Sequence, residues 1–254
     1  MGKELVVLLP AYNESENIEM LVERWVKQTP YLKDLDLHFR IFVINDGSAD
    51  STVEICRNLE HKYTNFSFIN HKVNMGLGSA LETGILHVIN TLPECTYIVV
   101  MDCDNTHDPK FIVPMVERMQ AEQMQDVVIA SRYRKGSKVF GVPFYRYFLS
   151  YGARFLYTLT LGVQNVRDYT CGYRLYRVSA LQRAHEAFSS TLIDEKGFSC
   201  MVELLYKMFL SGSRFTEIPF DLHYEDKLGQ SKMHVTKTAV SSLSLIRKLR
   251  KIQI

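Results

Sequence analysis

Tyr97-Ile-Val-Val-Met-Asp102-Cys-Asp104 is an uninterrupted apolar run that ends in two carboxylates. A short run rich in Val, Ile and Tyr is typical of a strand buried on both faces of a parallel sheet. In an extended chain, side chains two positions apart point the same way, so we expect Asp102 and Asp104 to face one point where the strand ends. Oxygen ligands of this kind suit Mg²⁺ or Mn²⁺, although an acidic turn after a core strand has the same pattern.

The step from strand to polar loop to helix recurs along the first half of the chain. Helix patterns begin near Ile18, Asp50 and Ser79 and alternate with strand patterns at 5–9, 40–44, 66–69 and 97–101. This alternation predicts an α/β fold, with a mostly parallel sheet flanked by helices on both faces. Ligands bind such sheets beyond the carboxyl ends of the strands. We therefore expect one crevice lined by Pro10 to Glu14, Asn45 to Ser48 and Asp102 to Asp104.

A fifth strand pattern, Asp126-Val-Val-Ile-Ala130, ends in Ser131-Arg132-Tyr133. It would bring an arginine, whose planar guanidinium suits phosphate, to the same crevice.

Composition limits the classes of protein that this chain can represent. Thirty basic and 28 acidic residues give a net charge of +2, so no global field favours nucleic acid as a partner. The five cysteines lack C-x-x-C spacing, which argues against a disulfide framework or a zinc site and favours a reducing, cytosol-facing location. We expect no signal peptide, because Met1-Gly-Lys-Glu-Leu5 runs directly into a strand pattern, and no transmembrane helix, because no apolar run reaches about 18 residues.

Gly76 and Gly78 open the helix pattern near Ser79 and superficially match a dinucleotide-binding loop. That loop requires a third glycine where Leu81 stands, and it belongs after the first strand, so we reject this interpretation. A phosphate-binding loop of the G-x-x-x-x-G-K-[ST] type is absent from the sequence as well. The glycine pair predicts a tight loop that brings backbone close to a ligand, or simply a helix entry.

Four ordered motifs resemble the inverting family 2 glycosyltransferases, which have the nucleotide-sugar-binding fold called GT-A. The motifs are Leu8-Leu-Pro-Ala-Tyr-Asn-Glu14, Val43-Ile-Asn-Asp-Gly-Ser48, Asn74-Met-Gly-Leu-Gly78 and Val100-Met-Asp-Cys-Asp104. The resemblance implies that Asp102 and Asp104 hold Mg²⁺ or Mn²⁺ on the diphosphate of a nucleotide-sugar donor. It also implies a donor site lined by Pro10, Ala11, Tyr12, Glu14, Asp46 and Gly76. Asn45 stands where the family often has an aspartate, which leaves the donor base open.

The second half of the chain resembles one branch of that family, the polyprenyl-phosphate glycosyltransferases, and most of all the dolichyl-phosphate mannosyltransferases. The segments that carry this resemblance are Ser131-Arg132-Tyr133, Arg167-Asp-Tyr-Thr-Cys-Gly-Tyr-Arg174 and Gly229-Gln-Ser-Lys232. It implies that Arg132 and Arg167 bind the phosphate of the acceptor, and that Ser231 and Lys232 lie near the donor diphosphate. The catalytic set would then be Asp102, Asp104, Arg132, Arg167 and Lys232.

The chain departs from the pattern of that branch at several positions. Tyr169 replaces a usual proline, Cys171 a usual serine and Gln230 a usual glutamate, and Asp226-Lys227 stand where an arginine is expected. A thiol is a weak hydrogen-bond donor, so Cys171 should not replace a serine that contacts phosphate.

The resemblance implies transfer of a hexose with inversion, mannose from GDP-mannose, to a polyprenyl or dolichyl monophosphate at the cytosolic face of a membrane. A phosphate monoester is anionic at neutral pH and needs no catalytic base. A first alternative is transfer to a sugar hydroxyl of a glycan or glycolipid, which needs a carboxylate base such as Asp168, Asp194, Glu195 or Glu203. A second alternative is an inactive GT-A scaffold or regulatory subunit, suggested by Asn45, Tyr169 and Cys171.

We interpret residues 1–254 as a single domain that carries two amphipathic segments. Residues 139–163 interleave aromatic and basic side chains, which suits a helix at a membrane interface or a helical pair packed on the core. Residues 236–254 predict a basic amphipathic helix that either contacts anionic lipid or coats the enzyme. Docking to a small membrane-embedded subunit would serve the same purpose.

Overall fold

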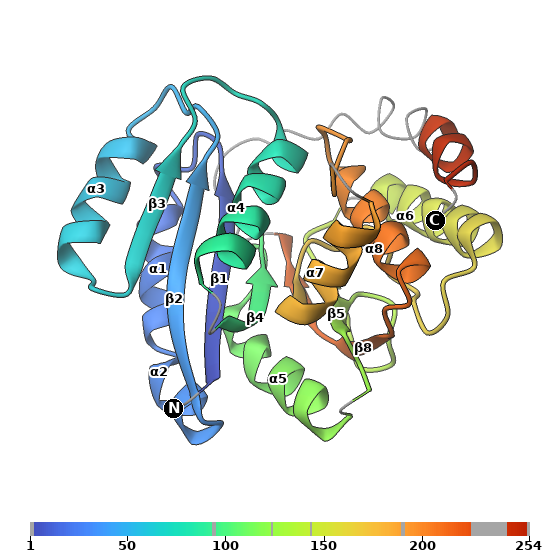
Figure 1. Cartoon of the computed structure of the whole chain (residues 1–254), viewed down its shortest axis with the longest axis horizontal. Helices are drawn as coiled ribbons and strands as arrows, with labels where there is room; N and C mark the ends of the chain where they lie inside the picture. The colour runs from blue at the N-terminus through green and yellow to red at the C-terminus, as the bar shows by residue number, and fades with distance from the viewer. Residues whose placement is uncertain are drawn as a thin grey trace.

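The computed structural model describes residues 3–92, 95–122, 124–142, 144–188, 191–224 and 243–252. Its centre is a seven-stranded sheet with the order β3-β2-β1-β4-β7-β5-β8 (Figure 1). The strands are β1 (Lys3–Ala11), β2 (Leu37–Asn45), β3 (Phe66–Asn70), β4 (Cys95–Val100), β5 (Val127–Ser131), β7 (Arg174–Arg177) and β8 (Phe215–Pro219). All neighbouring strands are parallel except where β7 meets β4 and β5. The predicted α/β fold with a mostly parallel sheet is confirmed.

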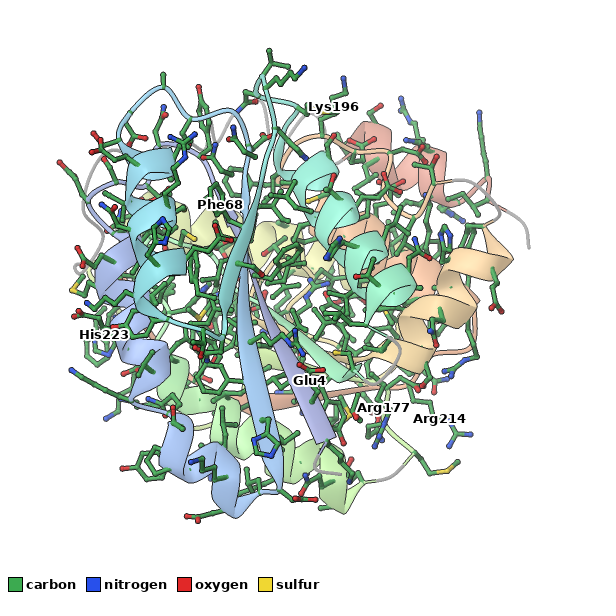
Figure 2. The ribbon with its side chains drawn as sticks, turned by 60° about the vertical axis from the view of Figure 1, so that its left-hand side comes forward. Glu4, Phe68, Arg177, Lys196, Arg214 and His223 are labelled. Atoms are coloured by element: carbon green, nitrogen blue, oxygen red, sulfur yellow. The ribbon has the colours of Figure 1, made fainter. Side chains whose placement is uncertain are left out.

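Helices cover both faces of the sheet, which explains why its central strands are almost entirely apolar. Leu5 to Leu9 of β1, and Ile98 and Val99 of β4, have no exposed surface. Figure 2 shows the strands between α3 on one side and α4 on the other. The helices of the sheet are α1 (Ile18–Val26), α2 (Thr29–Asp34), α3 (Thr52–Lys62), α4 (Leu77–Thr91), α5 (Ile112–Ala121), α7 (Val178–Ala187) and α8 (Cys200–Leu210), and a short 3₁₀ turn, η1 (Pro109–Phe111), precedes α5.

Strand β7 is the element that the sequence did not predict and on which the geometry of the site depends. Arg174, its first residue, lies opposite Val100 of β4 and Ile129 of β5. Because β7 starts near the level where β4 and β5 end, residues 167–173 reach the same edge of the sheet as Asp102 and Arg132. The antiparallel strand β7 therefore brings together three segments that are far apart in the sequence: the loop after β4, the loop after β5 and residues 167–173.

The segment 139–163 forms a strand and one helix instead of a helical pair. Strand β6 (Lys138–Phe140) pairs with β9 (Asp221–His223), and Phe140 stacks on His223 with ring centroids 4.7 Å apart. Helix α6 (Phe144–Leu161) follows. It buries Tyr157 and Leu161 against the body but leaves Phe155 and Leu159 more than two-thirds exposed, at 70% and 73%.

The described part of the predicted C-terminal helix coats the body. The helix runs from 243 to 249, and its apolar residues Leu245, Ile246 and Leu249 are buried. Lys248 fixes it to the neighbouring loop through an ion pair of 3.2 Å with Glu195. Its apolar side is thus used for packing, while Arg247 and Arg250 remain exposed. Residues 236–242 and 253–254 of the prediction lie outside the described residues.

The glycine pair before α4 packs against backbone from the second half of the chain. Gly78 donates its N–H to the carbonyl of Lys196 at 3.1 Å, and a Cβ added at Gly78 would lie 1.8 Å from the carbonyl oxygen of Glu195. Figure 2 shows Lys196 beside the beginning of α4. These contacts support the second interpretation, a helix entry, while an approach of the Gly76 backbone to the donor stays a prediction. The pair is a helix entry that joins the two halves of the molecule.

We predict that Gly78→Ala lowers the free energy of unfolding by about 2–3 kcal/mol, because the new methyl group would displace backbone instead of a movable side-chain end. Urea denaturation measures this change. Gly152→Ala is the matched control, since a Cβ at that position of α6 meets nothing within 4 Å and alanine favours a helix. Equal midpoints for the two variants would contradict the packing described for Gly78.

Candidate active site

The loops after β1 and β2 are held together by short hydrogen bonds at the carboxyl edge of the sheet. The backbone N–H of Asn13 donates to the Ser48 hydroxyl at 2.8 Å, and the N–H of Ala49 donates to the Asn13 side chain at 2.8 Å. The N–H of Glu14 donates to Thr52 at 2.9 Å. The predicted donor-site residues Pro10, Ala11, Tyr12 and Glu14 therefore do lie beside Asp46, whose N–H donates to the Ala11 carbonyl at 2.8 Å.

Asp46 organises the loop that leads to α4. Its Oδ1 accepts hydrogen bonds from the N–H of Met75 and from Nδ1 of His71, both at 2.9 Å. Its Oδ2 accepts the N–H of Gly76 at 2.8 Å. His71 in turn contacts the Thr83 hydroxyl at 3.1 Å. The buried carboxylate thus binds the protein's own backbone, a role that was not predicted for it, while the Tyr12 side chain is 38% exposed.

Asp102 and Asp104 lie in the loop that follows β4. Because the strand ends at Val100, the alternation of an extended chain does not by itself set their relative direction, and that the two side chains face one point stays a prediction. Asp104 accepts hydrogen bonds from the N–H and hydroxyl of Thr106, at 3.2 and 2.6 Å. Asp102 lies against the segment before β7, since a Cβ on Gly172 would meet its Oδ1 at 3.0 Å.

The donor set around these aspartates fits a hard divalent cation. Both carboxylates are partly exposed, whereas Cys103 between them is buried in the core. Burial raises the pKa of the Cys103 thiol well above its usual value, so no thiolate competes as a ligand. Within the described ranges, no three His, Cys, Asp or Glu side chains form a metal cluster. Two carboxylates, completed by water and substrate phosphate, are a typical arrangement for Mg²⁺.

A basic pocket of about 500 Å³ opens where β5 ends. It is lined by Arg132, Tyr133, Arg134, Lys135, Gly136, Ser137, Val139, Tyr151 and Arg167. The structure thus brings together Arg132 and Arg167, as the sequence predicted. Arg134 and Lys135 were missed, although they directly follow the Ser-Arg-Tyr segment. Among the described residues, no carboxylate lines this pocket.

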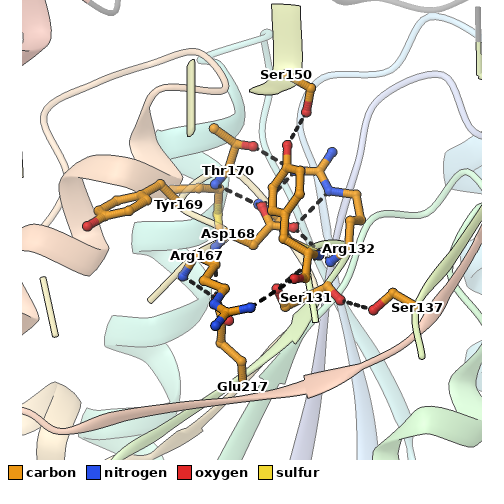
Figure 3. A network of polar contacts seen from close by, with 12 residues as sticks. Ser131, Arg132, Ser137, Ser150, Arg167, Asp168, Tyr169, Thr170 and Glu217 are labelled. Atoms are coloured by element: carbon orange, nitrogen blue, oxygen red, sulfur yellow. Dashed lines mark hydrogen bonds and ion pairs between the residues drawn. The ribbon is translucent and has the colours of Figure 1, made fainter. Parts of the chain in front are cut away.

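Arg132 is fixed by a bidentate pair with the fully buried Asp168 (Figure 3). Its Nε and Nη2 lie 2.8 and 2.7 Å from the two carboxylate oxygens, and Nη2 also reaches the Thr170 hydroxyl at 2.7 Å. Burial would raise the pKa of Asp168, but the Arg132 guanidinium outweighs it and holds that pKa below its ordinary value. Asp168 therefore orients an arginine and is a poor catalytic base.

The departures from the expected pattern in residues 169–174 have structural explanations. Tyr169 is buried, stacks on Tyr157 of α6, and accepts the N–H of Val163 at its hydroxyl oxygen. Cys171 is also buried, so its thiol does not line the pocket. Arg174 is fully buried and donates to the carbonyls of Tyr169, Cys171 and Met201, which makes it a structural residue.

The remaining carboxylates considered as bases are engaged in ion pairs. Glu203 of α8 is buried, accepts the N–H groups of Asp194 and Glu195 at 2.9 and 2.7 Å, and pairs with Lys207 at 3.0 Å. Lys207 also pairs with Asp194 at 3.0 Å, and Lys248 pairs with Glu195. Ser231 and Lys232, the predicted diphosphate ligands, lie outside the described residues, as do Asp226, Lys227 and Gln230.

Solved structures of similar fold bind nucleotide sugars. The mannosyltransferase PcManGT from Pyrobaculum calidifontis, in complex with GDP-Man and Mn²⁺, superposes with a TM-score of 0.63 at 14% identity, over 100% of this chain and 66% of that one. Glucosyl-3-phosphoglycerate synthase from Mycobacterium tuberculosis, in complex with Mn²⁺, UDP and glucosyl-3-phosphoglycerate, gives 0.61 at 18% identity, over 98% and 79%. The predicted GT-A fold is confirmed.

Sequence comparison specifies the family. Residues 6–184 match the profile described as glycosyl transferase family 2, and the chain belongs to that family. It is 29% identical to polyprenol monophosphomannose synthase of Mycolicibacterium smegmatis, over 90% of this chain and 80% of the relative. It is 27% identical to dolichyl-phosphate beta-glucosyltransferase ALG5A of Trichomonas vaginalis, over 96% and 72%.

We predict that Asp168→Asn lowers the free energy of unfolding by about 3 kcal/mol, because it leaves the Arg132 guanidinium without its buried counter-charge. Chemical denaturation at neutral pH measures the effect. Lys62→Gln is the control, because Lys62 forms an exposed pair with Glu23, with side chains 48% and 47% exposed. This substitution should lower the free energy of unfolding by less than about 1 kcal/mol. A small effect for Asp168→Asn would show that the pair does not hold the pocket together.

Proposed function

We propose that the protein transfers a hexose, with inversion, from a nucleoside-diphosphate sugar to a polyprenyl monophosphate. The observation that carries this proposal is the basic pocket, whose described lining holds three arginines, one lysine and no carboxylate. A sugar hydroxyl would gain little from such a pocket, whereas a phosphate monoester would be bound and oriented by it. Gly172 supports a connection with the donor side, because the pocket's loop touches Asp102 there.

The charge balance of the pocket favours a phosphate carrying nearly two negative charges. Arg132 is paired with Asp168, and Arg134 with Glu217 at 2.8 Å. Lys135 and Arg167 have no carboxylate partner within the part of the chain that the structure describes. Two uncompensated cations match a phosphate monoester, whose charge at pH 7 is about −1.5 to −2.

Transfer to a sugar hydroxyl receives less support from the structure. Such a reaction needs a carboxylate that accepts a proton, and the four candidates are all occupied. Asp168 binds Arg132, while Asp194, Glu195 and Glu203 pair with Lys207 or Lys248. A phosphate oxygen, already anionic, attacks the anomeric carbon without this help.

In the proposed reaction the chain's main task is to position and neutralise charge. Arg167 and Lys135 hold the acceptor phosphate, and Asp168 keeps Arg132 directed at the pocket. A divalent ion bound by Asp102 and Asp104 would stabilise the charge on the departing diphosphate. Attack from the side opposite the diphosphate inverts the anomeric carbon. We retain GDP-mannose as the proposed donor, while the resemblance to a dolichyl-phosphate beta-glucosyltransferase makes UDP-glucose the donor to test beside it.

We further propose that the enzyme works at the cytosolic surface of a membrane. No helix in the described ranges combines the length and the apolar character needed to cross a bilayer. Helix α6 instead exposes Tyr151, Phe155 and Leu159, spaced one turn apart, and Tyr151 also lines the pocket. An apolar stripe beside a phosphate pocket would allow the lipid chain and its headgroup to be held together. A small membrane-embedded subunit is a second partner that would fit this stripe.

We expect the purified protein, supplied with Mg²⁺ or Mn²⁺ and dolichyl phosphate, to convert radiolabelled GDP-mannose or UDP-glucose into an organic-extractable product. Arg167→Gln should raise KM for dolichyl phosphate at least tenfold, because it removes an uncompensated cation. Arg183→Gln is the matched control, since Arg183 forms an exposed pair with Asp126 away from the pocket. Absence of product with every nucleotide sugar would overturn the proposal.

We expect Asp102→Asn to weaken metal-dependent donor binding by at least tenfold, because it removes one of two anionic ligands. Isothermal titration with GDP and UDP, with and without Mn²⁺, measures it. Asp108→Asn is the control from the same loop, since Asp108 caps η1 and pairs with Arg24. Normal metal and nucleotide binding by Asp102→Asn would refute the ligand assignment, and no binding by the unsubstituted protein would favour an inactive scaffold.

A further inference from the structure

We propose that Glu217 is the positioning residue of the acceptor-phosphate pocket, an inference that rests on the proposed function for the identity of the ligand. Glu217 belongs to β8, pairs in register with Ile129 of β5, and has a side chain without exposed surface. It lies behind the pocket and is not among its lining residues. It therefore acts through other groups and does not touch the ligand.

One carboxylate joins the two segments that supply the pocket's cations. Its Oε1 accepts the backbone N–H groups of Arg167 and Asp168, at 2.7 and 2.8 Å. Its Oε2 lies 2.8 Å from Nε of Arg134. Because two consecutive N–H groups share one oxygen, the direction in which the Arg167 side chain leaves the backbone is fixed. Figure 3 shows Glu217 below Arg167 in this network.

The position of Arg134 depends on the same group. Besides Glu217, its guanidinium contacts the carbonyl of Asn165 at 3.1 Å. Arg134 follows β5, whereas Arg167 precedes β7, and no backbone pairing joins these two loops directly. Glu217 contacts both segments and so helps to set the distance between the two cations, beside the Arg132–Asp168 pair and the contact of Arg167 Nη1 with the Tyr133 carbonyl at 3.5 Å.

The chemistry of Glu217 suits an orienting role. Burial raises its pKa above the ordinary value, although the two backbone N–H groups and Arg134 oppose that shift. A glutamine at this position would keep a carbonyl oxygen for the two N–H groups but would present an amide donor to Arg134. Glu217→Gln thus separates the arginine from its partner while preserving the loop, which makes it the informative substitution.

The test measures both substrates separately. We expect Glu217→Gln to raise KM for dolichyl phosphate about tenfold, with KM for the nucleotide sugar unchanged and kcat within a factor of three. Combining it with Arg134→Gln should cost less than the product of the two single losses, because each change already removes the contact between Glu217 and Arg134, whereas combining it with Arg167→Gln should multiply the losses. If KM rose equally for both substrates and Tm fell as well, the role of Glu217 would be merely structural and the inference would be overturned.

A binding measurement distinguishes this inference from the proposed function. Calorimetry with farnesyl phosphate, a short prenyl monophosphate, should show binding by the unsubstituted protein and binding weakened about tenfold by Glu217→Gln. Equal binding by both proteins would overturn the role of Glu217 alone. No binding by the unsubstituted protein would overturn the proposed acceptor, and with it the assignment of Glu217 to a phosphate pocket.

Discussion

The site depends on one repeated interaction: a carboxylate that accepts neighbouring backbone N–H groups of a loop. Loops at the edge of a parallel sheet have N–H groups that no strand satisfies, and an anionic oxygen is the strongest acceptor available. Carboxylates of this kind among the described residues include Asp46 with Met75 and Gly76, Glu82 with Leu192 and Ile193, Asp168 with Arg132 and Cys171, Glu203 with Asp194 and Glu195, and Glu217 with Arg167 and Asp168.

This use of carboxylates explains how a nearly neutral chain builds a strongly charged site. The net charge is only +2, yet every charged residue in the described lining of the pocket is basic. Asp168 and Glu217 stand behind that lining, where they fix arginines without facing a ligand. Asp102 and Asp104, in contrast, keep partly exposed side chains. The position of an acidic residue in the fold, and not the composition of the chain, thus decides whether it orients an arginine or is available to bind a metal.

The sequence predicted those features that are local or carried by motifs. The structure confirmed the fold and the four steps from strand to loop up to Asp104. It also confirmed that Arg132 and Arg167 lie in one pocket. Apolar runs and strand ends determine these features. Strand β7 was missed because four residues with arginine at both ends, Arg174 to Arg177, have no distinctive strand pattern. Glu217 was missed because its partners lie 50 residues away in the sequence, where only the tertiary structure brings them together. The contacts of Asp46 with Met75 and Gly76 were missed because a motif does not reveal them, while its role at the nucleotide stays a prediction.

The place of β7 in the sheet also bears on how the chain is made. Strands β1 to β4 have one another as neighbours and are complete once residues up to Val100 have left the ribosome, whereas in the described sheet β5 joins that half through β7. Residues 127–131 are therefore synthesised well before their first partner, Arg174 to Arg177. During that interval the apolar strand Val-Val-Ile-Ala has no neighbouring strand to bind its backbone N–H and carbonyl groups. Strand edges of this kind are open to pairing with other chains. The strand that assembles the site is thus also the one whose late arrival leaves the nascent protein most exposed to aggregation.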